Sequence, residues 1–577
     1  MNMFPTFRHL CGGLFIALGA ATLTAQEMRP FVLPWDDASP TITDLSGLNT
    51  PIALNSSWVK PNDDGHLIRD GERLKFLGVN IGAQSAFPYL ADADKVAGRM
   101  AKFGINSVRF HHLEAPWAPG EILIDYSTGR SRDFSAEHLN RLHHFVARLA
   151  DHGIHTNMNL LVSRELQPGD GFPAAITELE WKEQQCLGFF DDHALLLQKE
   201  YATNLLGAPN PWRANTPLSQ DPAVTFVEIL NEYGYVQAWH DGTLDQLPDP
   251  FANTHRTHWN DWLATQYTDT AAVLAAWDSI NEPLGPELLN NADFSGGLSG
   301  WNLEQHNGAA AIGSASNAFT NGGPALQISI NAAGSASWHV QLNQSGLSVI
   351  AGQIYTVSFW AKADTDLPLS AGLTRAGPSD YGAVVEIANS TLDSTWREFS
   401  ATFVATADEP SLRLNFGGFG ARTGTLWIAD TRFSQGGQAG VPPAGTSLEQ
   451  RNLPTVLKSG SASAPTPAQL TDWIRYLLDA EIAYWDGMYS HIRDDIGYPG
   501  VIFGTIVANS PPGIQARLDA VDSHAYWQHP VFPREAWDPV DWTIENRSLI
   551  DDLGATIGNI ARQRVKGKPH ACLIRSR

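Results

Sequence analysis

The clearest chemical feature of the chain is the pair Asn231-Glu232, which ends an apolar run that begins at Ala223 and has the composition of a β-strand. In an α/β barrel, the carboxyl end of a buried strand carries its last residues to the mouth of the barrel, where catalytic groups gather. A glutamate in that place can act as a general acid or base, and the amide beside it can bind a hydroxyl group. A single Asn-Glu pair is common, so its meaning depends on the residues at the other strand ends.

Other predicted strand ends carry further polar and aromatic residues. These are Asn80, Arg109, His111, His112, Trp117, His524, Tyr526 and Trp527. Taken singly, each has an ordinary structural explanation, because a histidine at a strand end is usually a satisfied core residue and an arginine there usually an ion-pair partner. The succession of Arg109, Glu232 and His524 on the second, fourth and sixth strands is harder to obtain by chance and favours one shared site. Glu228 alternates away from the strand end and is expected to be buried against a helix or ion-paired.

The elements that must position these residues follow an alternating pattern of strands and helices from about residue 74. Apolar residues recur at helical spacing between the strands, and Gly104 and Gly153 end two of the helices. The predicted strands are 74–80, 105–111, 154–162, 223–231, 501–507, 518–524 and 569–574. Repeated βα units imply a parallel sheet that is covered on both faces. The predicted fold class is α/β, a (β/α)8 TIM barrel that is incomplete at seven strands.

A different pattern interrupts this one between the fourth and the fifth strand. Residues 287–435 are rich in Gly, Ser, Asn and Thr with short alternating runs, which predicts an inserted antiparallel β-sandwich. The predicted domains are accordingly 26–286 for the first part of the barrel, 287–435 for the sandwich, 436–464 for a loose linker and 465–577 for the second part of the barrel.

Four residues of the sandwich could bind ligands. Trp338 and Trp396 could present their rings to a glycan or pack into the core, and both alternatives stay open. Asp293 and Asp430 lie near the two ends of the segment and could meet around a structural calcium ion, which prefers oxygen ligands. For the barrel we expect no catalytic cofactor, because the spacing of its histidines fits no zinc pattern.

The barrel motifs resemble clan A glycoside hydrolases of the family 5 cellulase type, over about 65–286 and 465–570. The resemblance implies that Glu232 is the acid/base and that Asn231 holds a sugar 2-hydroxyl. It also implies that Arg109 orients a nucleophile, while His524 and Tyr526 support the nucleophile and the sugar. The expected partner is therefore a polysaccharide or oligosaccharide, bound with help from Trp117 and Trp527.

The inserted segment is similar to the family 4/9 carbohydrate-binding modules. Asn291–Trp301 resembles the opening of these modules, Tyr355–Lys362 their central strand and Leu426–Phe433 their last strand. The resemblance covers nearly the whole of 287–435 and implies a sandwich that binds carbohydrate.

The chain departs from the hydrolase pattern in two places. Asn157 and Asn159 stand near the third strand end, where family 5 commonly has a histidine. A retaining glycosidase also needs a second carboxylate about 5–5.5 Å from the first as nucleophile. After His570, where the family pattern has that glutamate, the sequence reads Ala571-Cys-Leu-Ile-Arg-Ser-Arg577 and no carboxylate follows. This ending resembles a frameshift or truncation.

Three functions are therefore considered. The first is a retaining glycoside hydrolase of ancestral activity that has lost its nucleophile, and the second is a non-catalytic carbohydrate-binding protein. The third is an inactive fragment. We expect the chain as written to be marginally soluble and essentially inactive, because the nucleophile is missing and the first strand keeps an unpaired edge.

Composition limits the partners and the location. Lys and Arg number 38 against 61 Asp and Glu, and the resulting net charge of −23 disfavours nucleic acids and anionic membranes. Arg8 precedes an apolar run from Leu10 to Leu23, which predicts a signal peptide over residues 1–25. The expected location is secreted or periplasmic in a bacterium, with no membrane span.

Overall fold

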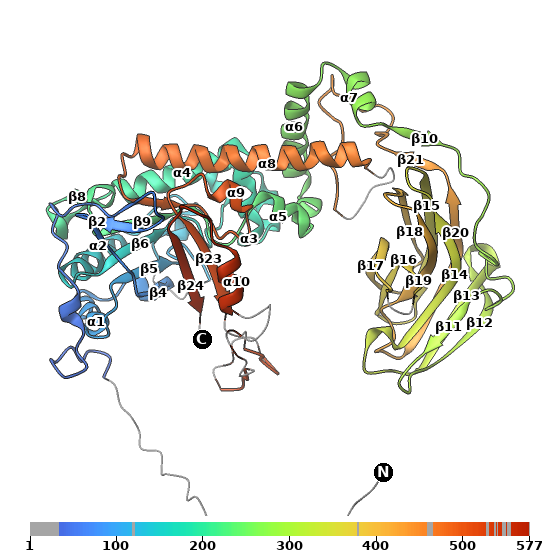
Figure 1. Ribbon diagram of the computed structural model, residues 1–577, viewed down its shortest axis with the longest axis horizontal. Coiled ribbons are helices and arrows are strands. Elements are labelled where there is room, and N and C mark those ends of the chain that lie inside the picture. The colour runs from blue at the N-terminus through green and yellow to red at the C-terminus, as the bar shows by residue number, and fades with distance from the viewer. Residues whose placement is uncertain are drawn as a thin grey trace, which may run out of the picture.

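Five parallel strands form the central sheet of an α/β unit, in the order β22-β9-β6-β5-β4. Their bounds are β4 (Gly78–Gly82), β5 (Ser107–His111), β6 (His155–Asn159), β9 (Val224–Glu228) and β22 (Val501–Phe503). The computed structural model shown in Figure 1 describes residues 34–117, 122–377, 380–458, 465–526, 530–535, 538, 540–544, 548, 550 and 556–575. The predicted signal peptide, residues 1–25, and Trp527 lie outside this range.

Two more parallel strands continue the sheet order. A parallel bridge joins Ile506, just after β22, to Asp522 in β23 (Val521–Tyr526), and β23 pairs in parallel with β24 (His570–Arg575). Seven parallel strands therefore succeed one another in chain order. All seven contribute residues to the wall of one cavity of about 410 Å³. Among the described residues, β4 pairs only with β5, and β24 pairs only with β23. These two end strands are not paired with each other, so the strand pairings do not close a barrel.

Burial explains why the central segments become strands. Every residue of β5 and of β9 is buried, including the polar ones. Parallel strands that are covered on both faces are rich in apolar residues, as Val224, Phe226 and Val227 are in β9. The helices that cover the sheet start at ordinary capping residues: Ser135 accepts from the backbone N–H of His138 at 3.4 Å, and Asp191 accepts from that of Ala194 at 2.9 Å.

The remaining elements of the α/β unit are helices and short hairpins. The helices are α1 (Leu90–Lys102), α2 (Ala136–Asp151), α3 (Trp181–Gln184), α4 (Asp192–Gly207), α5 (Tyr235–His240), α6 (Asp249–Gln266), α7 (Thr270–Ala276), α8 (Pro467–Ser490), α9 (Pro512–Gln515) and α10 (Thr556–Arg562). The short strands are β1 (Lys60–Pro61), β2 (Leu67–Arg69), β3 (Glu72–Arg73), β7 (Pro209–Asn210) and β8 (Thr216–Pro217). No helix among the described residues is both long enough and apolar enough to cross a membrane.

The segment between β9 and β22 contains an antiparallel β-sandwich, as predicted. One sheet has the order β11-β14-β19-β16-β17 and the other has the order β12-β13-β20-β15-β18. The bounds are β11 (Asn302–Gln305), β12 (Ala310–Phe319), β13 (Gly323–Ala332), β14 (Val340–Val349), β15 (Ile354–Ala363), β16 (Leu367–Arg375), β17 (Ala383–Leu392), β18 (Arg397–Val404), β19 (Glu409–Gly417) and β20 (Gly424–Gln435). Alternate residues of both sheets, such as Leu326, Phe359 and Phe416, point inward and fill one core.

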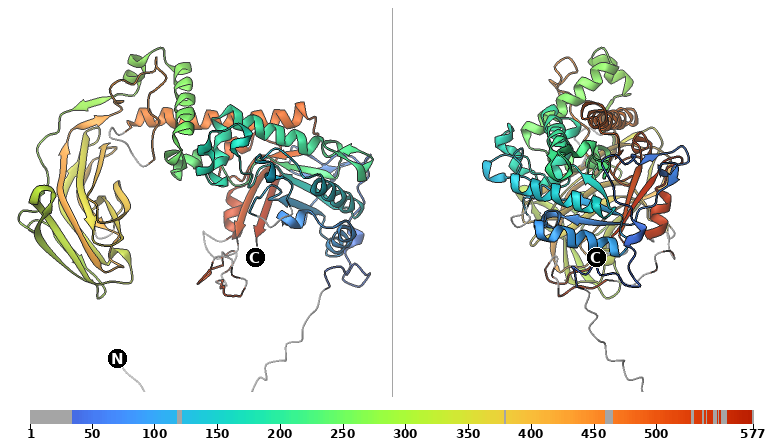
Figure 2. Two further views of the ribbon diagram at one scale, coloured as in Figure 1. Left: turned by 180° about the vertical axis from the view of Figure 1, so that it is seen from behind. Right: turned by 90° about the vertical axis from the view of Figure 1, so that its left-hand side faces the viewer.

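The chain enters and leaves the sandwich at a single junction. β10 (Ile280–Glu282) pairs antiparallel with β21 (Gly437–Ala439), so the incoming and outgoing segments are joined by a two-stranded ladder. Beyond it, α8 returns to the α/β unit and buries Trp473 and Trp485 in the same core as β9. The left view of Figure 2 shows α8 as a long helix against the α/β unit and the sandwich standing apart from that unit.

The predicted loose linker, 436–464, differs in the structure over the residues that are described. Leu448 and Leu453 are buried in the core of the α/β unit. The backbone carbonyl of Pro454 accepts from the indole N–H of Trp259 at 3.2 Å. This segment is therefore packed rather than loose, because its few apolar residues find a site against α6 that composition alone does not reveal.

Candidate functional site

Glu232 lies in the loop that follows β9, and its backbone is strained. Its φ of 48° falls in the left-handed region, which costs a non-glycine residue about 1–3 kcal/mol. Lys182, in α3, donates to the backbone carbonyls of Asn231 at 3.0 Å and Glu232 at 2.9 Å. The backbone N–H of Tyr233 donates to the hydroxyl of Thr505 at 3.2 Å. Contacts from two other elements therefore hold the backbone around Glu232 in place.

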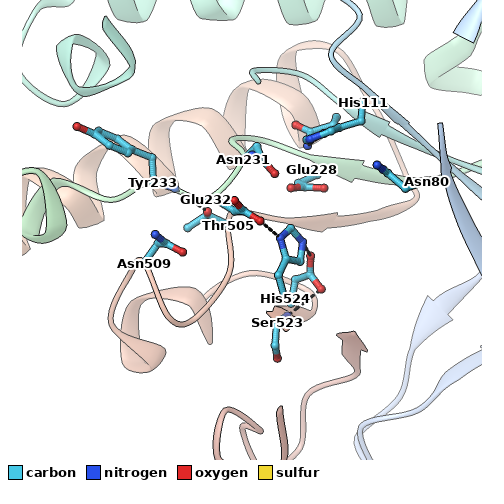
Figure 3. A network of polar contacts seen from close by, with 12 residues as sticks. Asn80, His111, Glu228, Asn231, Glu232, Tyr233, Thr505, Asn509, Ser523 and His524 are labelled. Atoms are coloured by element: carbon cyan, nitrogen blue, oxygen red, sulfur yellow. Dashed lines mark hydrogen bonds and ion pairs between the residues drawn. The ribbon is translucent and has the colours of Figure 1, made fainter. Parts of the chain in front are cut away.

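The side chain of Glu232 meets a histidine at the end of β23. Nδ1 of His524 contacts a carboxylate oxygen of Glu232, and Nε2 of His524 lies 3.1 Å from Oδ2 of Asp522. Figure 3 shows Glu232 and His524 turned toward each other. Burial disfavours the charged imidazole, but Asp522 and Glu232 outweigh it and raise the pKa of His524 to about 9. At neutral pH the imidazole is therefore protonated and lies between two carboxylates.

A buried arginine fixes the floor of the same site. The guanidinium of Arg109 donates to both oxygens of Glu228, at 2.6 Å and 2.7 Å, and to Oδ1 of Asn231 at 3.0 Å. It also donates to Oδ1 of Asn80 at 3.0 Å and lies 3.0 Å from Nδ1 of His111. Burial opposes the charge of Arg109, but Glu228 outweighs that effect and the pKa is raised. The ion pair between Arg109 and Glu228 is the one expected for Glu228. Through its further bonds to Asn80 and Asn231, Arg109 brings the ends of β4, β5 and β9 together.

The pKa of Lys182 links it to the site electrostatically. Burial lowers the pKa of Lys182 to about 8, and the nearby Glu232 carboxylate opposes this effect. Residue spacing did not point to Lys182, since a lysine inside a loop-rich stretch between strands gives no signal of its own. The position of Asp522 behind His524 depends on the direction of side chains along β23, which residue spacing does not specify.

Aromatic side chains border one side of the site. The ring of His112 lies 5.1 Å from that of Trp117 and 6.2 Å from that of Trp181, and its Nδ1 lies 3.0 Å from the Ser163 hydroxyl. Trp117 is 56% exposed, so its ring is open to a ligand. Tyr526 is half-buried at the carboxyl end of β23. Trp181 was missed by the sequence interpretation because it starts a four-residue helix rather than ending a strand.

The described residues contain one group whose atoms are close enough to hold a metal ion: Glu228, Asp522 and His524, within 4.8 Å of one another. Arg109 already occupies both oxygens of Glu228, and His524 carries a proton that Asp522 stabilises. Two positive charges therefore stand where the ion would bind. These residues fit an internal ion-pair network better than a metal site.

The sandwich carries a polar surface on the outer face of the sheet that contains β14 and β19. Arg413 donates to Thr374 at 3.1 Å and to Glu304 at 3.3 Å, and its guanidinium lies 4.5 Å from the centre of the Tyr381 ring. In the next row Asn343 lies opposite Asn415 in register, and Oδ1 of Asn415 is buried without a hydrogen-bond partner among the described residues. We call this surface, made of Glu304, Asn343, Thr374, Arg413 and Asn415, the polar face. Exposed residues border it, with Tyr381 54% and Trp338 51% exposed.

The other residues predicted in the sandwich lie elsewhere. Trp396 is half-buried, and its indole N–H donates to the carbonyl of Ala318 at 3.3 Å. Asp293 accepts from the backbone N–H of Ser295 at 3.0 Å, and Asp430 accepts from Arg432 at 3.1 Å. The calcium site at Asp293 and Asp430 stays a prediction.

Comparison with known proteins concerns the sandwich. Residues 286–418 match the family model for a carbohydrate binding domain. No curated protein matches the chain.

Several solved structures are similar to parts of the chain. One described as "CBM4 structure and function" is 24% identical, with 26% of this chain and 99% of that one covered and a TM-score of 0.22. The N-terminal cellulose-binding domain of Cellulomonas fimi β-1,4-glucanase C is 26% identical, with 24% and 88% covered and a TM-score of 0.19. The second such domain of the same enzyme is 19% identical, with 26% and 94% covered and a TM-score of 0.21.

Proposed function

We propose that this protein binds a polysaccharide through its sandwich and hydrolyses glycosidic bonds at Glu232. The observation that carries the hydrolytic part is the row Glu232–His524–Asp522 beside Arg109–Glu228, at the carboxyl ends of parallel strands. Catalytic groups of α/β barrels lie at those strand ends. The observation that carries the binding part is the family match over residues 286–418, together with the polar face on one sheet of the sandwich.

The proposal includes a barrel architecture. Seven parallel strands in chain order, all of which line one cavity, are what seven consecutive strands of a (β/α)8 barrel would give. In that arrangement the loops after β9 and β23 meet at the mouth of the barrel, where a sugar chain would lie across Glu232.

The proton needed for bond cleavage would come from the Glu232–His524 pair. The pair holds one proton near neutral pH, because the pKa of His524 is raised to about 9. As the glycosidic C–O bond breaks, the proton would pass from His524 through Glu232 to the leaving oxygen. Water would form the new bond to the anomeric carbon, and the proton that this water loses would return through Glu232 to the neutral imidazole. General acid catalysis of this kind contributes about 100- to 10,000-fold to a rate.

Sugar recognition would use the residues around this carboxylate. Asn231, which Arg109 holds by a 3.0 Å hydrogen bond, keeps its amide N–H₂ for a sugar hydroxyl. The exposed ring of Trp117 could stack on the apolar face of a sugar. The identity of the sugar would be set by loops around these residues.

A non-catalytic carbohydrate-binding protein is the second candidate, and a specific observation favours it. A retaining mechanism needs a second carboxylate that attacks the sugar. Glu228 is fully buried with both oxygens engaged by Arg109, and Asp522 is buried behind His524. Neither of these carboxylates is placed to act as a nucleophile, so a cleft that binds sugar without cleaving it is consistent with the same geometry.

Turnover separates the two candidates. The purified chain would be assayed on soluble β-glucans, mannans and galactans beside Glu232→Gln, which keeps the size of the side chain but cannot transfer the proton. Hydrolysis by the wild type that falls at least about 100-fold in the variant supports the hydrolase. Equal sugar binding by both proteins without any turnover supports the binding protein.

A further inference from the structure

The second sheet of the sandwich carries a group of aromatic side chains on its outer face. These are Phe319, Trp360, Trp396 and Trp427, which we call the aromatic face. All four are partly exposed, and none of them belongs to the residues that pack the sandwich core. Outward positions of a sandwich are normally polar, so three indoles gathered on one outer face need an explanation.

The four rings form one continuous group around a lysine. Lys362 lies opposite Trp427 in the register of β15 and β20, and its ammonium nitrogen lies 5.2 Å from the ring centres of both Trp396 and Trp427. Phe319 continues the group, with its ring 5.1 Å from that of Trp396 and 5.8 Å from that of Trp360. Cation–π contacts at this distance hold the two indoles on either side of the ammonium group.

Hydrogen-bonding side chains border the rings. Gln327 lies opposite Trp427 on the other neighbouring strand and donates to the hydroxyl of Ser329 at 3.3 Å. Glu398 lies opposite Trp360 in the register of β15 and β18. The face therefore combines flat apolar rings with amide, ammonium and carboxylate groups. A sugar ring has the matching chemistry, since one face presents C–H groups and its edge presents hydroxyl groups.

We propose that the aromatic face is a second carbohydrate-binding surface, on the sheet opposite the polar face. It would bind an extended polysaccharide chain by stacking on Trp360 and Trp427, with Lys362 and Gln327 donating to hydroxyl groups. This inference rests on the proposed carbohydrate binding of the sandwich. Because the two faces lie on opposite sheets, one sandwich could hold two polysaccharide chains at once, and two weak sites would act together on an insoluble substrate.

The test uses the full chain and three variants. Trp360→Ser with Trp427→Ser removes the stacking rings, Trp427→Phe keeps a ring in place, and Tyr381→Ala alters the polar face as the matched control. Thermal unfolding would first show that each variant folds. Titration calorimetry with soluble oligosaccharides would count the binding sites, and affinity electrophoresis would rank retention by the polysaccharides.

We expect three sites in the wild type, which are the Glu232 site, the polar face and the aromatic face, and two in the double serine variant, with retention weakened about three- to tenfold for the loss of the rings. Trp427→Phe should retain most of the binding. If the double serine variant does not fold, Lys362→Glu replaces it, because a carboxylate between two indole faces repels their π-electrons and should weaken retention in the same way.

Three results would overturn the inference. Unchanged site number and retention in a folded serine variant, with loss only in Tyr381→Ala, would remove the second surface and leave the proposed carbohydrate binding intact. A change in self-association by sedimentation, with unchanged sugar binding, would assign the aromatic face to a second copy of the chain. Absence of any sugar binding by the wild type would remove the proposed function of the sandwich and this inference with it.

Discussion

At the scale of single residues, His524 determines how the site responds to pH. Asp522 and Glu232 outweigh its burial and raise its pKa from 6.5 to about 9. The folded chain therefore holds this proton more tightly than the unfolded chain does. The resulting stabilisation is fully present below about pH 6.5 and is lost as the pH rises through about 9.

We predict that the free energy of unfolding falls by on the order of 3 kcal/mol across this pH window. Urea unfolding of the wild type and of His524→Gln at both ends of the window measures the effect. The glutamine variant should be less stable at neutral pH and should lose less stability on the alkaline side. Equal losses in the two proteins would show that another group titrates there.

Lys182 is the second residue with a testable role, because it bonds two consecutive backbone carbonyls beside the strained Glu232. Replacing it with methionine leaves both carbonyls without this donor at a site that is partly closed to water. We predict a loss of about 1–3 kcal/mol in stability and weaker sugar binding at the Glu232 site. Lys182→Gln keeps a donor and should recover part of both quantities in urea unfolding and calorimetry. Full stability in Lys182→Met would contradict the role.

At the scale of elements, the site depends on the contact between the loop after β9 and the loop after β22. Glu481, in α8, accepts from the backbone N–H groups of Tyr235 at 3.0 Å and Val236 at 3.1 Å. It also accepts from the hydroxyl of Ser510. Its buried carboxylate, whose pKa is raised by burial, therefore joins three segments that are far apart in the sequence. The long helix that follows the sandwich is thus part of the support for Glu232.

Gly234 tests this contact between loops. A Cβ atom at Gly234 would lie 2.1 Å from the backbone oxygen of Asn509, so any side chain forces the two loops apart. We predict that Gly234→Ala costs about 1–3 kcal/mol in thermal or urea unfolding and lowers sugar binding at the Glu232 site. Gly207→Ala is the matched control, since nothing lies within 4 Å of its Cβ position. Equal stability of the two variants would show that the loops can separate without cost.

At the scale of the whole molecule, the junction of β10 and β21 separates the sandwich from the α/β unit. Glu282 lies opposite Gly437 in this ladder, so the two ends of the inserted segment are adjacent. Replacing residues 283–436 with an Asn-Gly turn would close the ladder as a hairpin, because that dipeptide favours the turn that joins paired strands. We predict that the shortened chain folds cooperatively and loses retention on insoluble polysaccharide.

Soluble sugar binding at the Glu232 site should persist in this shortened chain. Thermal unfolding and affinity electrophoresis measure the two properties beside the full chain. A shortened chain that fails to fold would mean that the sandwich stabilises the α/β unit, and unchanged retention would mean that the sandwich does not bind the polysaccharide.

Much of the architecture could be predicted from local patterns. The strands β5, β6 and β9 lie within runs that the alternation of strand and helix patterns predicts, and the alternating runs of the sandwich form antiparallel strands. The same patterns predicted a loose linker at 436–464, whereas Leu448 and Leu453 of this segment are packed in the core. The prediction was wrong because a few isolated apolar residues do not reveal what they will contact. The predicted arrangement of the seven strands as an incomplete barrel depends on pairings between distant segments, which periodicity does not specify.

The sequence by itself indicated which segments form the parallel strands, and so it predicted that Arg109, Asn231, Glu232 and His524 lie near the carboxyl ends of these strands. Only the tertiary structure decided what each of them touches. The pairing of Glu232 with His524, of His524 with Asp522, and of Arg109 with Glu228 depends on strand register and side-chain direction. The support of Lys182 and the aromatic face around Lys362 likewise arise from contacts between distant segments. Local propensity acts along the chain, whereas the pKa of a buried group is set by neighbours that folding brings within a few ångströms of it.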